Sequence, residues 1–282
     1  MQLTTQRMDT STVEAREHDP ETYWSRRYAS IDITKSGHIN LPLQYNRWLY
    51  RRKQSQLARG LRSSQFAARN STVLEAAVGS GVYVEMWQAK GVKQLTGIDI
   101  SQNAISWLQR RFPRFSFIKA DLTVPNLAAL TGKGFDLVTA FDVLYYIDDD
   151  SKFDIALRNL AETVKPGGWL AIHDPILPHQ ELLRDHRKLR TIARYKAALS
   201  KAGFQIVWRR PTFFFAVQPR STQPFWAQPW LMKGIWSRLT GPSIRRFPNA
   251  SGCIVYWLDR WLGMLFRDGP SYCMLICRKV RS

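Results

Sequence analysis

Short apolar runs and amphipathic stretches alternate through the middle of the chain. Five apolar runs between residues 72 and 173 are each bounded by polar or glycine-containing segments, which is typical of buried strands. The predicted strands are residues 72–76, 94–98, 116–120, 135–140 and 169–173. Between them, apolar positions at helical spacing predict helices at residues 82–89, 103–111 (with Ser101 as the N-cap) and 151–163. The alternation indicates an α/β fold with a parallel sheet.

The flanking segments add elements at both ends. The polar segment 1–20 is followed by two helices, predicted at residues 21–30 and 43–61. After the fifth strand, the pattern predicts a helix at residues 185–202, a strand at 204–209 and a last strand at 272–280. Five prolines within residues 218–250 predict an irregular insertion between these last two strands.

A further amphipathic helix, predicted at residues 253–266, ends this insertion. Its apolar positions fall on one helical face and are Ile254, Trp257, Leu258, Trp261, Leu262 and Leu265. A helix of about 14 residues is roughly 21 Å long and cannot cross a bilayer. Because apolar faces generally seek a core, we expect this face to pack against the sheet; contact with a membrane surface is the alternative.

Three acidic residues recur at corresponding places in the first three strands. Glu75 lies within the first strand, while Asp99 and Asp121 directly follow the apolar runs of the second and third. Parallel strands bring their carboxyl ends to one crevice, where Gly79 and Gly81 would let the backbone approach a ligand closely. An acid after the second strand can accept both ribose hydroxyls, and one after the third can accept from an adenine amine. The strand acid favours a cationic ligand group over a pyrophosphate, and the lack of a third glycine argues against a nicotinamide dinucleotide.

These features resemble the class I S-adenosylmethionine-dependent methyltransferases. Residues 73–81, Val-Leu-Glu-Ala-Ala-Val-Gly-Ser-Gly, are similar to the first motif of that family, roughly E-x-G-x-G-x-G, with Ala77 in place of its first glycine. Residues 135–147 resemble the fourth strand with its following motif, and Lys-Pro-Gly-Gly at 165–168 resembles the turn before the fifth strand. The resemblance covers residues 70–175.

The resemblance implies a Rossmann-like α/β fold, namely a seven-stranded mixed sheet with helices on both faces and the last strand antiparallel beside the fifth. We expect residues 1–69 to form an N-terminal tail and helical lid, 70–217 the S-adenosylmethionine-binding core, and 218–282 a basic, Trp-rich elaboration with the final strand. The expected cofactor is S-adenosylmethionine. The residues expected to bind it are Glu75, Ala77, Gly79, Ser80, Gly81, Asp99, Ile100, Asp121, Leu122, Phe141 and Asp142.

The net charge of +19 is unevenly distributed over the 282 residues. Residues 183–282 hold 19 Lys and Arg against three Asp and Glu, together with six of the eleven Trp, whereas residues 71–182 hold 10 against 13. A basic, aromatic-rich segment fits an anionic membrane surface, RNA, an acidic partner, or simply a solvated face. We rank peripheral membrane contact ahead of nucleic acid, because no RNA-binding module is visible.

Other classes of protein are disfavoured by composition. A hydrophobic content of 45% supports one large core with additions at both ends. The polar start lacks the apolar region of a secretory signal and no apolar run reaches 18 residues, so we expect a cytoplasmic protein, with membrane association limited to the surface. Three Cys without a matching set of His indicate neither a disulfide framework nor a metal site.

Methyl transfer from a sulfonium requires alignment of acceptor, methyl and sulfur, and a general base helps when the acceptor is a hydroxyl. His173, at the end of the fifth strand, is the candidate base, and a structural histidine bonded to backbone is the alternative. Asp174 could interact with a protonated ring, although adjacent strand residues point to opposite faces. Tyr145 and Tyr146 are further catalytic candidates, with a place in the pocket wall as the alternative role for each. Candidates for lining the substrate pocket, each with core packing as the alternative, are Tyr23, Tyr28, His38 and Tyr45.

The main functional hypothesis is a methyltransferase that acts on a small or medium organic acceptor at a hydroxyl oxygen. The alternatives are RNA or a protein side chain, a membrane-associated lipid or glycan, and a carbon or amine of a metabolite. A binding protein without activity is a third class, supported only by Ala77. No Asp-Pro-Pro-Tyr-like segment follows the fourth strand, so the resemblance disfavours amide nitrogens of nucleic acids or proteins.

Overall fold

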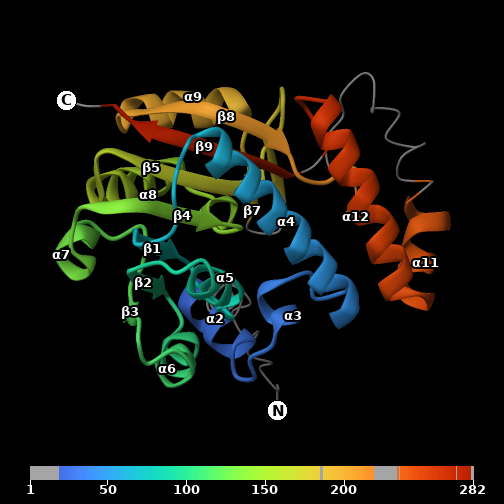
Figure 1. The fold of residues 1–282 in the computed structure, drawn as a ribbon, viewed down its shortest axis with the longest axis horizontal. Coiled ribbons are helices and arrows are strands. Elements are labelled where there is room, and N and C mark those ends of the chain that lie inside the picture. The colour runs from blue at the N-terminus through green and yellow to red at the C-terminus, as the bar shows by residue number, and fades with distance from the viewer. Residues whose placement is uncertain (1–18, 185–186, 219–233, 235, 271, 281–282) are drawn as a thin grey trace, which may run out of the picture.

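A seven-stranded mixed sheet forms the centre of the molecule (Figure 1). The computed structural model describes residues 19–184, 187–218, 234, 236–270 and 272–280. The strand order is β3-β2-β1-β4-β5-β9-β8, with β1 to β5 parallel and β9 antiparallel to both β5 and β8. The strands are β1 Thr72–Ala76, β2 Gln94–Asp99, β3 Ser116–Lys119, β4 Phe135–Phe141, β5 Val164–Pro175, β8 Phe204–Pro211 and β9 Tyr272–Lys279. The predicted fold class is confirmed, including the antiparallel last strand beside the fifth.

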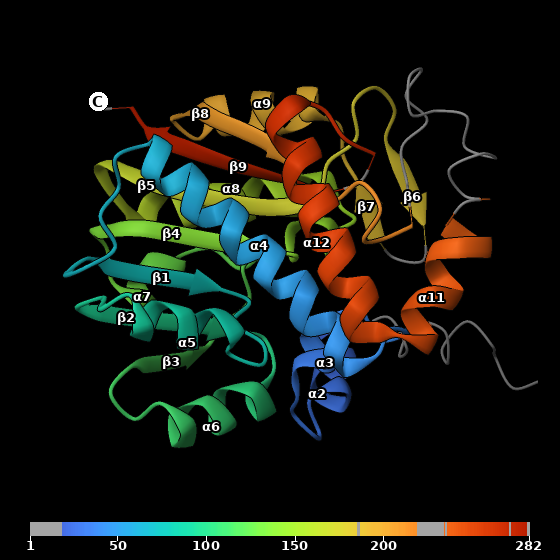
Figure 2. The same ribbon diagram turned by 45° about the vertical axis from the view of Figure 1, so that its right-hand side comes forward.

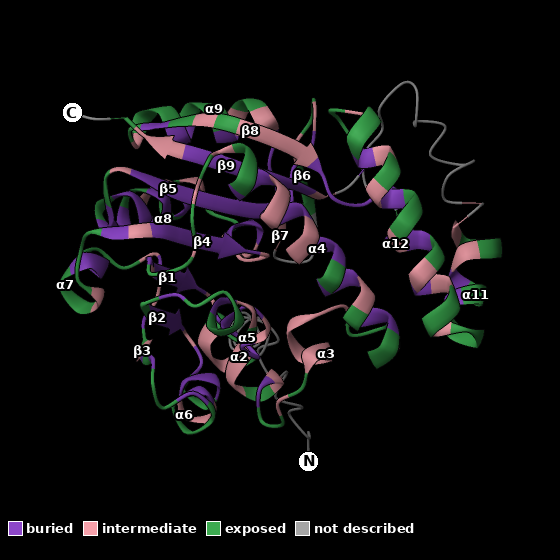
Figure 3. Ribbon diagram, viewed as in Figure 1, coloured by how far each residue is buried: buried purple, intermediate pink, exposed green. Residues whose placement is uncertain are grey.

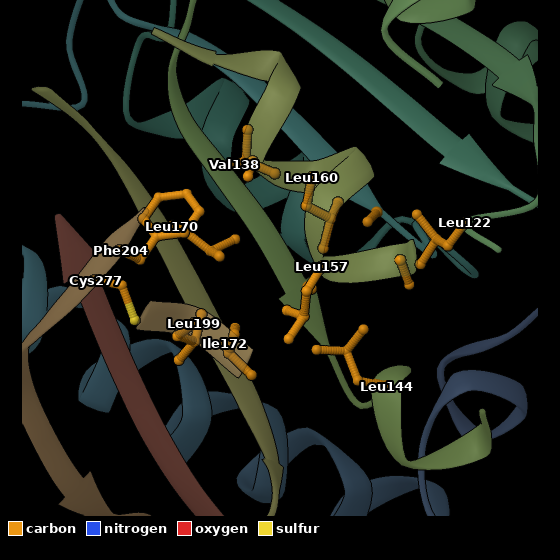
Figure 4. Packing of buried hydrophobic residues seen from close by; sticks show 14 of the residues in the cluster. Leu122, Val138, Leu144, Leu157, Leu160, Leu170, Ile172, Leu199, Phe204 and Cys277 are labelled. Carbon is orange, nitrogen blue, oxygen red and sulfur yellow. The ribbon is translucent and has the colours of Figure 1, made fainter. Parts of the chain in front are cut away.

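Helices cover both faces of this sheet (Figure 2). One face carries α7 Leu127–Thr131, α8 Asp150–Thr163 and α9 Ile192–Lys201. The other carries α4 Leu43–Ser63, α5 Val82–Ala89 and α6 Gln102–Arg111, with α12 Pro248–Leu265 beside α4. Beneath α8 and α9 the core is mostly aliphatic, with Leu157, Leu160 and Leu199 packed against Val138 and Ile172 of the strands (Figure 4). This close packing fixes the strand ends on which the candidate site is built.

Local sequence signals explain most element boundaries. Ser101 Oγ accepts a hydrogen bond from the backbone N of Ala104, as predicted for the N-cap of α6. The predicted helix at 185–202 is wrong at β7 Arg187–Leu189, which pairs antiparallel with β6 Leu182–Arg184, while residues 185 and 186 lie outside the described residues. The α9 helix begins only after Thr191, whose side chain accepts from the backbone N of Arg194 at 3.1 Å. The N-cap therefore sets a later start than the apolar pattern predicted.

The N-terminal helices differ in position. The two predicted helices are present as α2 Pro20–Arg27 and α4, and an additional short helix, α3 Ile33–Ser36, lies between them in the chain. Asp32 caps α3 by accepting from the backbone N of Thr34 at 2.6 Å. Ser36 accepts from the backbone N of Ser80, which places α3 against the glycine turn after β1. The α4 helix instead lies across the sheet beside α12 (Figure 2).

The expectation that the apolar face of residues 253–266 packs against the sheet is wrong. The buried residues of α12 are Gly252, Val255, Asp259 and Gly263. Five of the six residues of the apolar stripe are exposed, and the sixth, Leu262, is partly buried (Figure 3). The helix packs through a seam in which the Asp259 carboxylate accepts from the backbone N of Phe215 at 2.9 Å and of Ala216 at 3.2 Å. A buried charge with backbone donors thus decides which side faces inward, and it leaves the apolar side chains outside.

The predicted irregular insertion is only partly within the described residues. Residues 219–233 lie outside them, while the part before α12 forms a π-helical turn, Trp236–Thr240, and the short helix α11 Gly241–Arg246. Here the proline-based prediction of irregular structure is wrong, because Pro242 and Pro248 occupy first-turn positions of helices, where the missing N–H has no intrahelical acceptor to lose. Among the described helices, none has both the length and the apolarity needed to cross a membrane.

Candidate cofactor and acceptor site

A cavity of about 660 Å³ opens at the carboxyl ends of β1, β2 and β4, beneath α2; we refer to it as the carboxyl-end cavity. Its size falls in the range of roughly 300–1,000 Å³ that is common for small-molecule sites. Nine of the eleven residues predicted to bind the cofactor line it. They are Glu75, Ala77, Ser80, Asp99, Ile100, Asp121, Leu122, Phe141 and Asp142. The topology therefore brings the acids of separate strands together, as the sequence spacing predicted.

The remaining two predicted residues, Gly79 and Gly81, shape the turn without lining the cavity. Both have left-handed backbone conformations, with φ of +53° and +76°. A Cβ on Gly79 would lie 2.5 Å from Ser36 Oγ and 2.7 Å from the hydroxyl of Tyr28, so a side chain there would displace the N-terminal helices. Ala77 also has positive φ, +55°, although it carries a side chain. At this position a glycine would be free of the strain that an alanine must bear.

Three polar atoms of the cavity wall are buried without a hydrogen-bond partner among the described residues. They belong to the Glu75 carboxylate (Oε2), the Ser80 hydroxyl and the Tyr83 hydroxyl. Burial raises the pKa of Glu75 well above its usual value. Buried polar groups are normally satisfied, so unsatisfied ones in a cavity point to a polar ligand that completes them. Glu75 in particular could receive an ammonium group.

Asp99 ties the end of β2 to the glycine turn. One carboxylate oxygen accepts from the backbone N of Gly79 at 2.9 Å and the other from the backbone N of Ser101 at 2.9 Å. Burial raises the pKa of this carboxyl to about 6, against the lowering effect of these hydrogen bonds. Each oxygen can accept a second hydrogen bond, as a pair of ribose hydroxyls would require. Asp121 accepts in the same manner from the backbone N of Thr123, at 2.8 Å.

Asp142 lies in the cavity wall between two basic side chains. One of its oxygens is 2.5 Å from the Lys53 ammonium, and the other is 2.7 Å from Nδ1 of His173. Burial alone would raise the pKa of Asp142, but Lys53 and His173 hold it well below its usual range. The backbone at Asp142 has φ of +57°, an unusual conformation for a residue with a side chain. Such strain is most often kept where the side chain must point in a particular direction.

His173 is fully buried and does not line the carboxyl-end cavity. Burial lowers the pKa of its ring, an effect that Asp142 partly offsets. The ring stacks on Tyr272, with centroids 5.3 Å apart and planes at 9°. Its carboxylate partner is Asp142, not Asp174, which lies on the opposite sheet face and accepts from the hydroxyl of Tyr195 at 2.7 Å. Within the described structure, His173 therefore reaches the cavity through Asp142.

The tyrosine candidates are split between cavity and core. Tyr146 lines the carboxyl-end cavity, and Tyr145 is buried behind it with ring centroids 4.3 Å apart. Tyr28 lines the cavity, with its hydroxyl 2.9 Å from Ser36 Oγ. Tyr45 is core, since its hydroxyl donates to the carbonyl of Ala216 at 2.9 Å. The cavity wall does not include Tyr23, which is exposed, or His38.

Trp24, Tyr50 and Lys53 are among the residues of this region that sequence reasoning missed. Trp24 stacks on Tyr28 at 5.6 Å between centroids and meets Tyr146 edge-on at 5.1 Å, which makes an aromatic wall on one side of the cavity. The spacing of these residues in the sequence could have indicated that each shares a helical face with another residue of the region. Trp24 is four residues before Tyr28, and Lys53 follows Tyr50 by three, so each pair shares a helical face.

The fold and the strand-end acids define a class I S-adenosylmethionine-dependent methyltransferase. Residues 45–208 match the model of a family described as a methyltransferase domain, and this span is more than half of the chain. The protein belongs to this family of methyltransferase domains.

Two curated relatives resemble parts of the chain. Nodulation protein S of Bradyrhizobium diazoefficiens is 30% identical over 114 residues, which are 40% of this chain and 54% of the relative. An mRNA cap guanine-N(7) methyltransferase of Caenorhabditis elegans is 28% identical over 154 residues, which are 49% of this chain and 40% of the relative. The chain thus spans about half or less of the length of these curated relatives.

Solved structures extend the likeness in fold to nearly the whole chain. The N-methyltransferase NodS of Bradyrhizobium japonicum WM9, in complex with S-adenosyl-L-homocysteine, has a TM-score of 0.54 at 18% identity and covers 92% of this chain and 97% of its own. Magnesium protoporphyrin IX methyltransferase of Synechocystis PCC 6803, with bound S-adenosylmethionine, has a TM-score of 0.55 at 14% identity and covers 99% and 100%. At such identities the likeness concerns the fold alone.

Proposed function

We propose that the protein transfers a methyl group from S-adenosylmethionine to a hydroxyl oxygen of a small or medium organic acceptor. The observation that carries the proposal is Asp142, a carboxylate held in the cavity wall between Lys53 and His173. A hydroxyl becomes strongly acidic as it is methylated, and a fixed carboxylate can orient it and take up its proton. The neighbouring positive charge keeps Asp142 ionised and ready to accept that hydrogen bond.

The residues of the carboxyl-end cavity fit the cofactor. When bound, S-adenosylmethionine supplies an electrophilic methyl group on a sulfonium. Glu75, with its unpartnered oxygen, would hold the methionyl ammonium, and Asp99 the ribose hydroxyls. Asp121 would accept from the exocyclic amine of adenine, as the resemblance implies. Gly79 and Gly81 would act through the shape of the turn, because neither lines the cavity.

The N-terminal helices would exclude water and align the acceptor. Trp24 and Tyr28 bring aromatic surface from α2 and its C-cap to the cavity, facing Tyr146 of the segment after β4. Such a wall suits an acceptor with a flat or apolar body, and its closure would keep bulk water from the sulfonium. His173 would act as a positioning residue that fixes the Asp142 carboxylate, because its ring does not touch the cavity.

The charge of the cavity favours a small acceptor over nucleic acid. Its lining includes seven acids against two lysines, and the acids are Asp19, Glu21, Glu75, Asp99, Asp121, Asp142 and Asp148. A polyanion would be repelled by this excess of negative charge. A nitrogen acceptor is the second candidate, because the structure of NodS carries the name of an N-methyltransferase.

A product analysis tests the proposal. The protein would be incubated with S-adenosylmethionine labelled in the methyl group and with matched pairs of acceptors, each an aromatic alcohol or phenol and its amine analogue, beside a short RNA. We expect label on the hydroxyl compounds, and mass spectrometry would locate it on oxygen. Transfer to the amines or to RNA with the hydroxyl compounds unlabelled would contradict the proposal.

A substitution at His173 tests the arrangement behind Asp142. His173→Ala should lower kcat by about 100-fold, the effect of a displaced catalytic group, and leave the affinity for S-adenosylhomocysteine unchanged. His173→Asn should recover part of the loss, because its amide can donate to Asp142. A loss of about 10³–10⁴-fold with no rescue, and with removal of a titration from the pH profile of kcat, would instead support His173 as the base. Unchanged turnover would assign His173 a purely structural role.

A further inference from the structure

The α12 outer face is a continuous apolar surface on the outside of the molecule. We define it by the five side chains Ile254, Trp257, Leu258, Trp261 and Leu265, each between 45% and 61% exposed. Met264, at its edge, is 48% exposed. Single exposed apolar side chains are ordinary, but two tryptophans and three aliphatic residues along one helical stripe are not. Such a stripe is typical of a surface that contacts another one.

The opposite side of α12 explains why this face stays outside. A Cβ on Gly252 would lie 2.3 Å from Trp48 of α4, and one on Gly263 would lie 2.7 Å from the Arg52 guanidinium. Arg52 also donates to the backbone carbonyl of Asp259 at 3.0 Å. Small residues fix the inner side against α4, and the Asp259 carboxylate accepts from the backbone of Phe215 and Ala216. A rotation that buried the tryptophans would therefore break this seam.

Positive charge surrounds the α12 outer face. Between residues 236 and 267 the sequence holds five arginines and a single acid, Asp259, which is buried in the seam. The arginines, four exposed and Arg260 partly buried, are Arg238, Arg245, Arg246, Arg260 and Arg267. The Arg260 guanidinium lies 5.6 Å from the Trp257 ring centre, and that of Arg246 lies 5.9 Å from Phe247, so charge and apolar surface adjoin. The face thus offers apolar side chains that can insert into a lipid bilayer and arginines that can attract anionic headgroups.

We propose that the α12 outer face docks the protein on an anionic lipid bilayer. In this arrangement α12, about 27 Å long at helical rise, lies parallel to the membrane plane. Trp257 and Trp261 enter the boundary between headgroups and acyl chains, and the arginines contact lipid phosphates. An apolar stripe with basic flanks gives the two signals that stable peripheral binding requires.

The composition of the face argues against two other binding partners, a second copy of the chain and RNA. A second copy of the chain would bring the same set of arginines against itself, with no exposed acid between residues 236 and 267 to pair with them. The next acid, Asp268, is exposed but already pairs with Arg209 at 2.7 Å. RNA would pair with the arginines, but Ile254, Leu258 and Leu265, three of the five side chains of the face, offer neither hydrogen bonds nor stacking to it. An anionic bilayer satisfies both the apolar side chains and the arginines around them.

Vesicle flotation tests the proposal with the full chain. We expect binding to vesicles of phosphatidylcholine mixed with phosphatidylglycerol and much weaker binding to phosphatidylcholine alone. The double variant Trp257→Ser/Trp261→Ser should bind the mixed vesicles about 100-fold more weakly, since two apolar side chains leave the interface. The matched control, Leu183→Ser/Val207→Ser, also removes two exposed apolar side chains but lies outside α12, and it should bind like the unchanged protein. Both variants should keep their affinity for S-adenosylhomocysteine, so the outcome is independent of the acceptor.

Other results would overturn the proposal. Absence of binding to the mixed vesicles, or equal binding by the double tryptophan variant, would remove the membrane assignment. A dimer in sedimentation velocity that the same variant dissolves, without vesicle binding, would assign the face to a second copy. Complete loss of vesicle binding at high salt, combined with tight binding to a short RNA, would assign it to nucleic acid, because phosphate contacts weaken steeply with salt.

Discussion

Two neighbouring residues of α4 contact two different regions, the carboxyl-end cavity and α12. In the part of the chain that the structure describes, the cavity contains buried polar atoms without partners, whereas α12 has apolar side chains without a cover. Lys53 pairs with Asp142 at the carboxyl-end cavity, and Arg52 donates to Asp259 of α12. In the cavity, polar atoms such as Glu75 Oε2 are buried without a partner among the described residues. At α12, the buried Asp259 carboxylate accepts hydrogen bonds from the backbone, and the apolar side chains of the outer face remain exposed. Unsatisfied polar groups indicate a small polar ligand, whereas an uncovered apolar face indicates an extended surface.

The largest expected effect is that of a substitution at Asp99, which should change cofactor binding and leave membrane binding unchanged. Asp99→Ala should abolish measurable binding of S-adenosylhomocysteine, because it removes the acceptor for the ribose hydroxyls and also frees the backbone N of Gly79 and Ser101. Calorimetric titration would measure the affinity, and we expect a loss of more than about 100-fold. Vesicle binding through the α12 outer face should be unchanged. Near-native affinity for the cofactor product would contradict the ribose assignment.

A substitution at the seam of α12 should instead lower stability and leave cofactor binding nearly unchanged. Asp259→Ala leaves two backbone N–H groups, those of Phe215 and Ala216, without their buried acceptor. We expect the free energy of unfolding, measured in urea, to fall by about 2–4 kcal/mol, with cofactor affinity nearly retained at temperatures where the protein stays folded. Asp268→Ala, at an exposed acid near the end of α12, is the control and should change stability by less than about 1 kcal/mol. Equal effects of the two substitutions would show that the seam does not hold α12.

A pH series sharpens the role of Asp99 within the cavity. Burial raises the pKa of this carboxyl to about 6 from its usual value of 3.8. Because the ionised form should accept the ribose hydroxyls, affinity for S-adenosylhomocysteine should fall by about tenfold per pH unit below pH 6. The contribution of Asp99 to stability has the opposite sign. The folded state holds the proton more tightly, so this contribution rises as the pH falls from 6 toward 3.8.

Glu75, whose pKa burial also raises, adds to this dependence. Asp99→Asn would therefore weaken the pH dependence of binding without removing it. Isothermal titration between pH 5 and 7 distinguishes the two residues if Glu75→Gln is measured in parallel. An affinity that stays constant over this range in the unchanged protein would contradict the requirement for an ionised Asp99.

The same comparison shows what the sequence could predict. The cavity depends on strand ends, and strand ends follow from short apolar runs and glycines, so Asp99 and Asp121 could be placed from spacing alone. The inner side of α12 depends on Asp259, whose partners, Phe215 and Ala216, lie more than forty residues away in the chain. Helical periodicity identifies an apolar face but not what covers it. Likewise, the partner of His173 is Asp142, 31 residues away, and not the adjacent acid.

Ala77 gives the smallest expected effect and tests the glycine turn itself. Its φ of +55° is costly for alanine and free of strain for glycine, whereas glycine also loses more backbone entropy on folding. The two contributions oppose each other, and we expect Ala77→Gly to raise the free energy of unfolding by about 0.5–1 kcal/mol, as chemical denaturation would measure. The adjacent Ala76, in the extended strand β1, is the control. Ala76→Gly should destabilise by at least about 0.5–1 kcal/mol, because there the entropy loss has no strain to offset it. If both substitutions destabilise the protein, alanine at position 77 bears no strain that glycine would relieve. The left-handed backbone of the turn would then be set by the contacts of Gly79 with Ser36 and Tyr28, and not by the residue type at position 77.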